Sequence, residues 1–99
     1  MPNYVFTYRQ AKGASLNMDE TDSWFKWFDE IGEHITERGS AVASSRQVGN
    51  VGGDQSVSGF TVISARDMDH AVELAHGCPA IALGHGLEVG ELLVIPAAA

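Results

Sequence analysis

Two histidines flank the only cysteine of the chain, and these three residues are the first candidates for chemistry. His76, Cys78 and His85 carry side chains that bind zinc or nickel. A tetrahedral site needs three or four converging ligands, however, and this spacing does not pair ligands in both halves of a motif. We therefore expect no metal. His76 fits better in the last turn of a helix, where the helix dipole favours a positive charge.

His85 is the candidate for acid–base chemistry. It stands in a glycine-flanked turn before the last predicted strand, and imidazole titrates near neutral pH. The alternative is a plain turn residue. Tyr8 is a candidate hydrogen-bond donor, and Tyr8, Trp24, Trp27 and His85 are the residues expected to line a ligand pocket. His34 and His70 are expected on the surface.

An aromatic helix must position part of this pocket. Large apolar residues recur at steps of three and four, which predicts a helix over residues 23–38: Trp24, Trp27, Phe28, Ile31 and Ile35. Gly39 is expected to end it in a left-handed conformation. We expect Trp24 and Phe28 to form the wall between helix and sheet, with Trp27 at the edge, toward the cavity mouth or a partner subunit.

The remaining elements complete an alternating order. Strands are predicted at residues 3–8, 40–48, 58–65 and 87–96, and loops at 9–21 and 49–56. A second helix is expected to begin after Asp67 as its cap and to end at Gly77 and Pro79. The order β-α-β-β-α-β predicts a single α+β domain over residues 1–99 with an antiparallel, ferredoxin-like sheet. Its helix-free face needs cover, which favours a homodimer.

Charge and composition exclude several partners. Thirteen acidic against six basic residues give a formal charge of −7, which argues against nucleic acid and against an anionic membrane. A single cysteine forms no internal disulfide, and the chain begins without a signal-peptide pattern. We expect a cytoplasmic protein.

The stretch "GFTVISARDMDHAVELAHGCPAIALGHGLEVGELLVI" resembles the C-terminal half of the YCII-related (DGPF) domain family. The specific matches are Gly77-Cys78-Pro79 and Leu87-Glu88-Val89, and "WFKWFDEIGEHITERGSAV" is similar to the family's Trp-bearing helix. The resemblance implies a dimeric α+β barrel in which Cys78 is a small buried residue after the helix stop. Two features differ: "GNVGGDQSVSGF" replaces the Asp-Gly-Pro-Phe tetrapeptide, and Phe28 stands near the position of a histidine that some members carry.

Two functions remain open. One is a homodimeric small-ligand-binding or accessory protein whose apolar cavity is lined by the helix aromatics and Tyr8. The other is a cofactor-independent enzyme acting on a small aromatic or lactone-like substrate, with His85 as acid or base. No cofactor is expected in either case.

Overall fold

The structure is a computed structural model, and it describes residues 1–11 and 21–95. Along the chain its elements are β1 (Asn3–Ala11), α1 (Thr21–Glu30), the 3-10 helix η2 (Gly32–His34), β2 (Ile35–Ala41), β3 (Gln55–Ser64), α2 (Met68–Ala75), α3 (Pro79–Ala82) and β4 (Gly86–Glu91). The part of the predicted loop at 12–20 and the predicted strand end at Pro96 lie outside the described residues.

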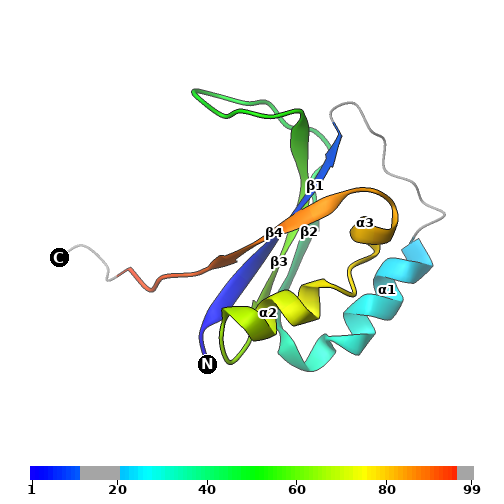
Figure 1. Cartoon of the computed structure of the whole chain (residues 1–99), viewed down its shortest axis with the longest axis vertical. Helices are drawn as coiled ribbons and strands as arrows, with labels where there is room; N and C mark the ends of the chain where they lie inside the picture. The colour runs from blue at the N-terminus through cyan, green and yellow to red at the C-terminus, as the bar shows by residue number, and fades with distance from the viewer. Residues whose placement is uncertain (12–20, 96–99) are drawn as a thin grey trace.

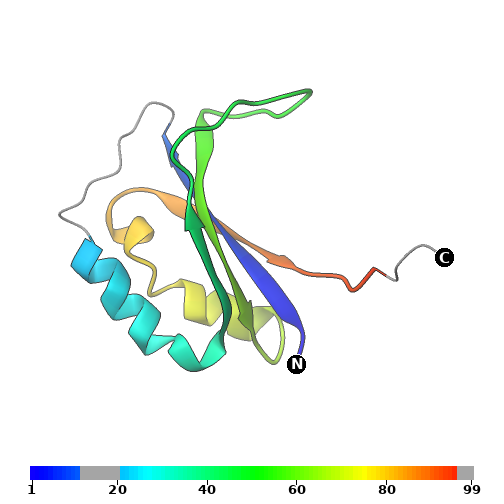
Figure 2. The same ribbon diagram turned by 180° about the vertical axis from the view of Figure 1, so that it is seen from behind.

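The sheet has the order β2-β3-β1-β4, and its neighbouring strands are all antiparallel. The helices lie on one side of the sheet, and the other side is bare (Figures 1 and 2). This arrangement confirms the predicted α+β, ferredoxin-like fold.

Successive side chains of the two central strands, β1 and β3, lie on opposite faces of the sheet. On β1, Tyr4, Phe6 and Tyr8 are buried beneath the helices, whereas Val5 and Thr7 point to the bare side. On β3 the buried residues under the helices are Thr61 and Ile63, and the bare-side residues are Phe60 and Val62, which pair with Thr7 and Val5. The core therefore lies wholly between the sheet and the helices.

The first helix is shorter than predicted. It ends at Glu30, and a 3-10 turn follows before the chain enters β2 at Ile35, so the prediction of a helix to residue 38 and a strand at 40–48 was wrong. Gly32 interrupts the helix, and backbone pairing of Ile35–Ala41 with β3 outweighs the helical spacing of the side chains. Gly39 lies inside β2 at φ +77°, not at a helix end.

The inward face of α1 also differs from the prediction. Trp27 is only 2% exposed and Ile31 4%, whereas Trp24 and Phe28 are half-buried. The Trp27 ring stacks on Phe6 at 5.9 Å between centroids, and its Nε1 donates a hydrogen bond to the Leu74 carbonyl. Because Trp27 points into the core, Trp24 and Phe28 are displaced toward the edge that had been assigned to Trp27.

In the second half of the chain the helices lie largely where the local sequence predicts them. The Asp67 carboxylate accepts a hydrogen bond of 2.8 Å from the His70 amide and caps α2, as predicted. Ala71 and Ala75 of α2 are buried, whereas the apolar residues Met68 and Val72 are more than a third exposed. Pro79 occupies the first turn of α3, a short helix where a turn was expected.

Two segments extend beyond the sheet on its bare side: residues 42–54 between β2 and β3, and residues 92–95 after β4 (Figures 1 and 2). The second was predicted as part of the last strand, but β4 ends at Glu91, and Leu93, Val94 and Ile95 are 79%, 95% and 82% exposed. Within the described residues no helix is long and apolar enough to cross a bilayer.

Candidate functional site

A cavity of about 330 Å³ opens between α1, the ends of the central strands, and the turn from α3 to β4. This volume is at the lower end of the range for small-molecule sites, about 300–1,000 Å³. It suits a ligand of one or two rings. The residues that line it are Tyr8, Arg9, Gln10, Thr21, Trp24, Phe28, Arg38, Gly39, Ser40, Ala41, Ser58, Gly59, Phe60, Thr61, Ala80, Leu83 and His85.

The aromatic wall comes from α1 and β1. Trp24 and Phe28, four residues apart on α1, lie on the same side of the helix with ring centroids 6.0 Å apart. The Tyr8 ring meets Trp24 edge-on at 4.8 Å and 80°. These three rings present faces and edges to the cavity, which is the arrangement that accommodates a flat apolar ring.

A buried hydrogen-bond chain crosses the cavity floor. The Tyr8 hydroxyl donates to Thr61 Oγ1 at 2.7 Å, and Thr61 Oγ1 donates to the Arg38 carbonyl at 2.9 Å. Burial raises the pKa of Tyr8 far above its ordinary value, so the phenol remains neutral. Because its proton is donated to Thr61, the Tyr8 oxygen has acceptor capacity left for a ligand. Its expected role as donor to a ligand stays a prediction.

Two glycines bring the strand backbones close together at this floor. A Cβ on Gly59 would lie 2.8 Å from the Ser40 carbonyl oxygen and 3.4 Å from the Tyr8 ring. A Cβ on Gly39 would lie 1.8 Å from the Phe60 carbonyl oxygen. Side chains at these positions would displace the strands or fill the space beside Tyr8.

His85 reaches the cavity from the opposite wall. Its amide donates a 2.8 Å hydrogen bond to the Ala80 carbonyl, which fixes the turn after α3, and its half-buried side chain lines the cavity near Leu83. His85 is the only histidine among the described lining residues. Acid–base chemistry here would therefore depend on one imidazole beside the neutral Tyr8 phenol.

The structure brings Tyr8, Trp24 and His85 together around the cavity, whereas Trp27 lies in the core and does not line it. Sequence reasoning did not find the polar members Arg38 and Thr61. Arg38 was missed because its segment was assigned to a helix. Thr61 was missed because it is a polar residue on the buried face of a strand.

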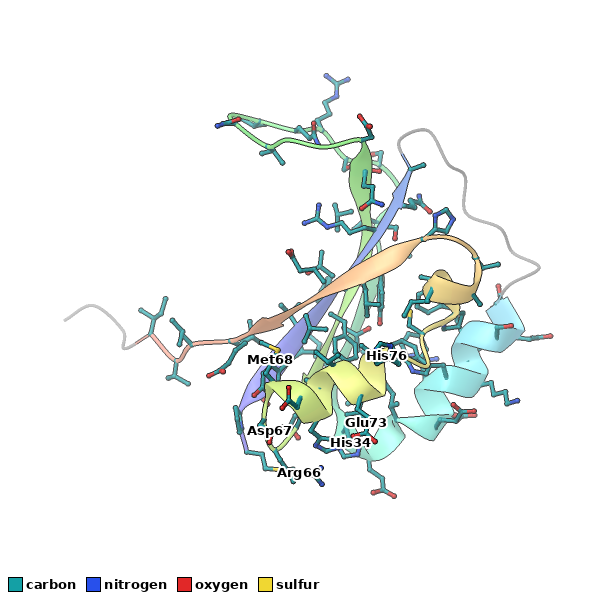
Figure 3. The ribbon with its side chains drawn as sticks, viewed as in Figure 1. His34, Arg66, Asp67, Met68, Glu73 and His76 are labelled. Atoms are coloured by element: carbon teal, nitrogen blue, oxygen red, sulfur yellow. The ribbon has the colours of Figure 1, made fainter. Side chains whose placement is uncertain are left out.

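The other chemically active residues lie elsewhere. Cys78 is 2% exposed and its burial raises the pKa of the thiol to about 11, so it is the small buried residue that the family resemblance implies. His34 and His70, both expected on the surface, are half-buried, and their rings meet edge-on with centroids 5.1 Å apart. In Figure 3 His34 lies against α2, while the exposed His76 lies at the far end of that helix.

No group of three or more histidine, cysteine, aspartate or glutamate side chains suited to a metal ion occurs in the described part of the chain. His76, Cys78 and His85 therefore form no such group. Cys78 is buried in the core, and His85 faces the cavity.

No protein-family model and no curated protein sequence matches the chain. Among solved structures it is similar to 5-chloro-2-hydroxyhydroquinone dehydrochlorinase (TftG) from Burkholderia phenoliruptrix AC1100, solved in complex with 2,5-dihydroxybenzoquinone. The TM-score is 0.65 at 16% sequence identity, over 92% of this chain and 93% of that one. At this identity the likeness shows a shared fold, and it extends over nearly the whole of both chains.

Proposed function

We propose that the chain is a YCII-related, homodimeric protein that binds a small aromatic molecule in the cavity beside Tyr8. The cavity with Trp24, Phe28 and Tyr8 on its walls is the observation that carries this proposal. The family assignment is supported by the Gly77-Cys78-Pro79 motif and by the fold shared with TftG. A cytoplasmic location belongs to the same proposal and is supported by the single buried cysteine.

Native mass spectrometry of the purified protein tests the binding function. A small molecule that co-purifies in stoichiometric amount and is lost from a Leu83→Trp variant, which fills the cavity, would support it. The control is Ile81→Trp, because Ile81 is similarly exposed, at 42%, but does not line the cavity. A cavity that takes up no small aromatic compound from a screened mixture would contradict the proposal.

The dimer is proposed from the bare face of the sheet. Val5, Phe60 and Val62 form its apolar centre. The exposed segment 92–95 extends on the same side (Figures 1 and 2) and adds four apolar side chains. A second copy presents the same surfaces, so two sheets packed face to face would cover both.

Analytical ultracentrifugation of two matched variants tests this assembly. Val94→Asp places a charge on the bare side and should shift the protein toward monomer. Ile81→Asp places the same charge at a 42% exposed position in the helical layer and should leave association unchanged. Wild-type protein that sediments as a 10.6 kDa monomer throughout the micromolar range would contradict the dimer.

A cofactor-independent enzyme is the second candidate function. It is favoured by the position of His85 on the cavity wall and by the fold shared with an enzyme whose structure contains a dihydroxybenzoquinone. His85→Gln removes the titrating group but preserves a polar side chain of similar reach. Turnover of a small aromatic or lactone-like substrate that is lost in His85→Gln with unchanged ligand binding would establish the enzyme. Equal turnover in both proteins would refute the role of His85.

A further inference from the structure

The charges on the cavity wall have one sign. The chain carries thirteen acidic and six basic residues, yet the described residues that line the cavity include Arg9 and Arg38 and no aspartate or glutamate. The protein has a net charge of −7, so the sign of the charge on this wall is opposite to that of the protein as a whole. A concave site lined by one sign of charge concentrates ligands of the opposite sign.

The two arginines differ in what their guanidinium groups contact. Arg9 Nη2 lies 3.6 Å from Glu88 Oε1, so part of its charge is already compensated. Arg38 forms no ion pair with any described residue, and its guanidinium carbon lies 5.0 Å from the Phe25 ring centroid and 4.8 Å from that of Phe28. These aromatic faces hold the guanidinium without neutralising it, and its N–H groups remain able to bind an anion.

Arg38 also links the charge to the aromatic wall. Its side chain packs on Phe28, which lines the cavity, and its carbonyl accepts the hydrogen bond from Thr61 at the floor. A flat ring placed against Trp24 and Tyr8 would thus have a cation at one end. The Tyr8 oxygen would face the ring as an acceptor for a hydroxyl group.

We propose that the ligand is a small aromatic anion, a carboxylate or a phenolate, whose negative group is bound by Arg38. This inference rests on the proposed function, because it names the ligand class of the same cavity. Arg38 is then the residue that determines specificity for an anion over a neutral ring of the same shape.

The test compares two isosteric probes, benzoate and its neutral amide benzamide, by two-dimensional NMR titration of wild-type protein. Benzoate should bind at least about tenfold more tightly, because an arginine–carboxylate contact is charge-assisted. Arg38→Gln should remove this preference, and Arg38→Lys should retain part of it. Arg66→Gln removes the same charge at an exposed position outside the cavity and should have no effect. A nitrophenolate titration distinguishes a phenolate-binding site from a carboxylate-binding one.

Failure of the anion inference and failure of the proposed binding function give different results. If benzamide and benzoate shift the cavity resonances with equal affinity, or if Arg38→Gln retains the preference for benzoate, the cavity binds aromatic rings but the role of Arg38 is refuted. If neither probe nor nitrophenolate shifts these resonances, the binding function itself is refuted and the anion inference falls with it. Urea melts of each variant verify that the exposed Arg38 can be replaced without unfolding.

Discussion

Replacing Trp27 tests the core most severely, because this side chain packs against both the sheet and α2. Truncation to alanine removes a 2% exposed indole, its stacking on Phe6 at 5.9 Å, and its 3.2 Å hydrogen bond to the Leu74 carbonyl. Truncating a buried tryptophan costs about 3–5 kcal/mol, and the lost hydrogen bond accounts for about 1 kcal/mol. Domains of this size are stable by about 5–15 kcal/mol in total. Trp27→Ala should therefore be close to unfolding.

Urea melts of three variants measure this effect. Trp27→Phe keeps a stacked ring but loses the N–H group and part of the volume, so it should cost about 1–2 kcal/mol. Phe25→Ala is the matched control, because Phe25 is an aromatic residue of the same helix that is 50% exposed and contacts only the Arg38 guanidinium among the described aromatic and cationic groups. It should cost less than about 1 kcal/mol. Equal losses in Trp27→Ala and Phe25→Ala would refute the assignment of Trp27 to the core.

Three further predictions concern the backbone, a helix cap and the buried thiol. Gly39→Ala should destabilise more than Gly49→Ala in thermal melts, because both have φ +77° but only a Cβ at Gly39 would collide, at 1.8 Å, with a backbone oxygen; equal losses would contradict this reasoning. Asp67→Ala should cost about 1 kcal/mol by loss of the α2 cap, and Asp67→Asn much less, which urea melts would measure. Cys78 should resist alkylation at pH 8 in the folded protein and react on unfolding, because burial keeps its thiol protonated. Since the pKa of Cys78 is raised from 9.0 to about 11, the unfolded chain loses this proton first as pH rises. The free energy of unfolding should therefore fall between pH 9 and 11, with a shallower fall in Cys78→Ala; rapid alkylation of folded protein would overturn this account.

The sequence predicted the topology because each of its signals is local. The apolar strand at 58–65, the Asp67 cap and the Gly77-Cys78-Pro79 helix stop all act within a few residues, and the order of elements then determines the ferredoxin-like sheet. The end of the first helix was not predictable in this way. Residues 35–38 have helical spacing of their side chains, yet their pairing with β3, some 25 residues away in the chain, decides their conformation.

The same error shifted the predicted site. With the helix extended to residue 38, Ile35 appeared to continue a line through Trp24 and Phe28, and the stripe was placed one residue out of phase. The true stripe runs through Trp27 and Ile31. Arg38 was hidden by the same assignment, because in a helix it would have served only as a cation near the C-terminal end of the dipole. Tyr8, Trp24 and His85 do line the cavity, but their role in binding a ligand stays a prediction.

The most direct test of the binding cavity is the response of the two tryptophan indole N–H resonances to a small aromatic ligand. Trp24 lines the cavity, whereas the Trp27 N–H group donates to the carbonyl of Leu74 on α2, and neither Trp27 nor Leu74 lines the cavity. Titration with benzoate, monitored by two-dimensional NMR, should shift the Trp24 indole signal together with the amides of Gly59 and His85, and leave the Trp27 indole signal nearly unchanged. A Trp27 response larger than that of Trp24, or shifts scattered over the surface without saturation, would contradict a ligand site in this cavity.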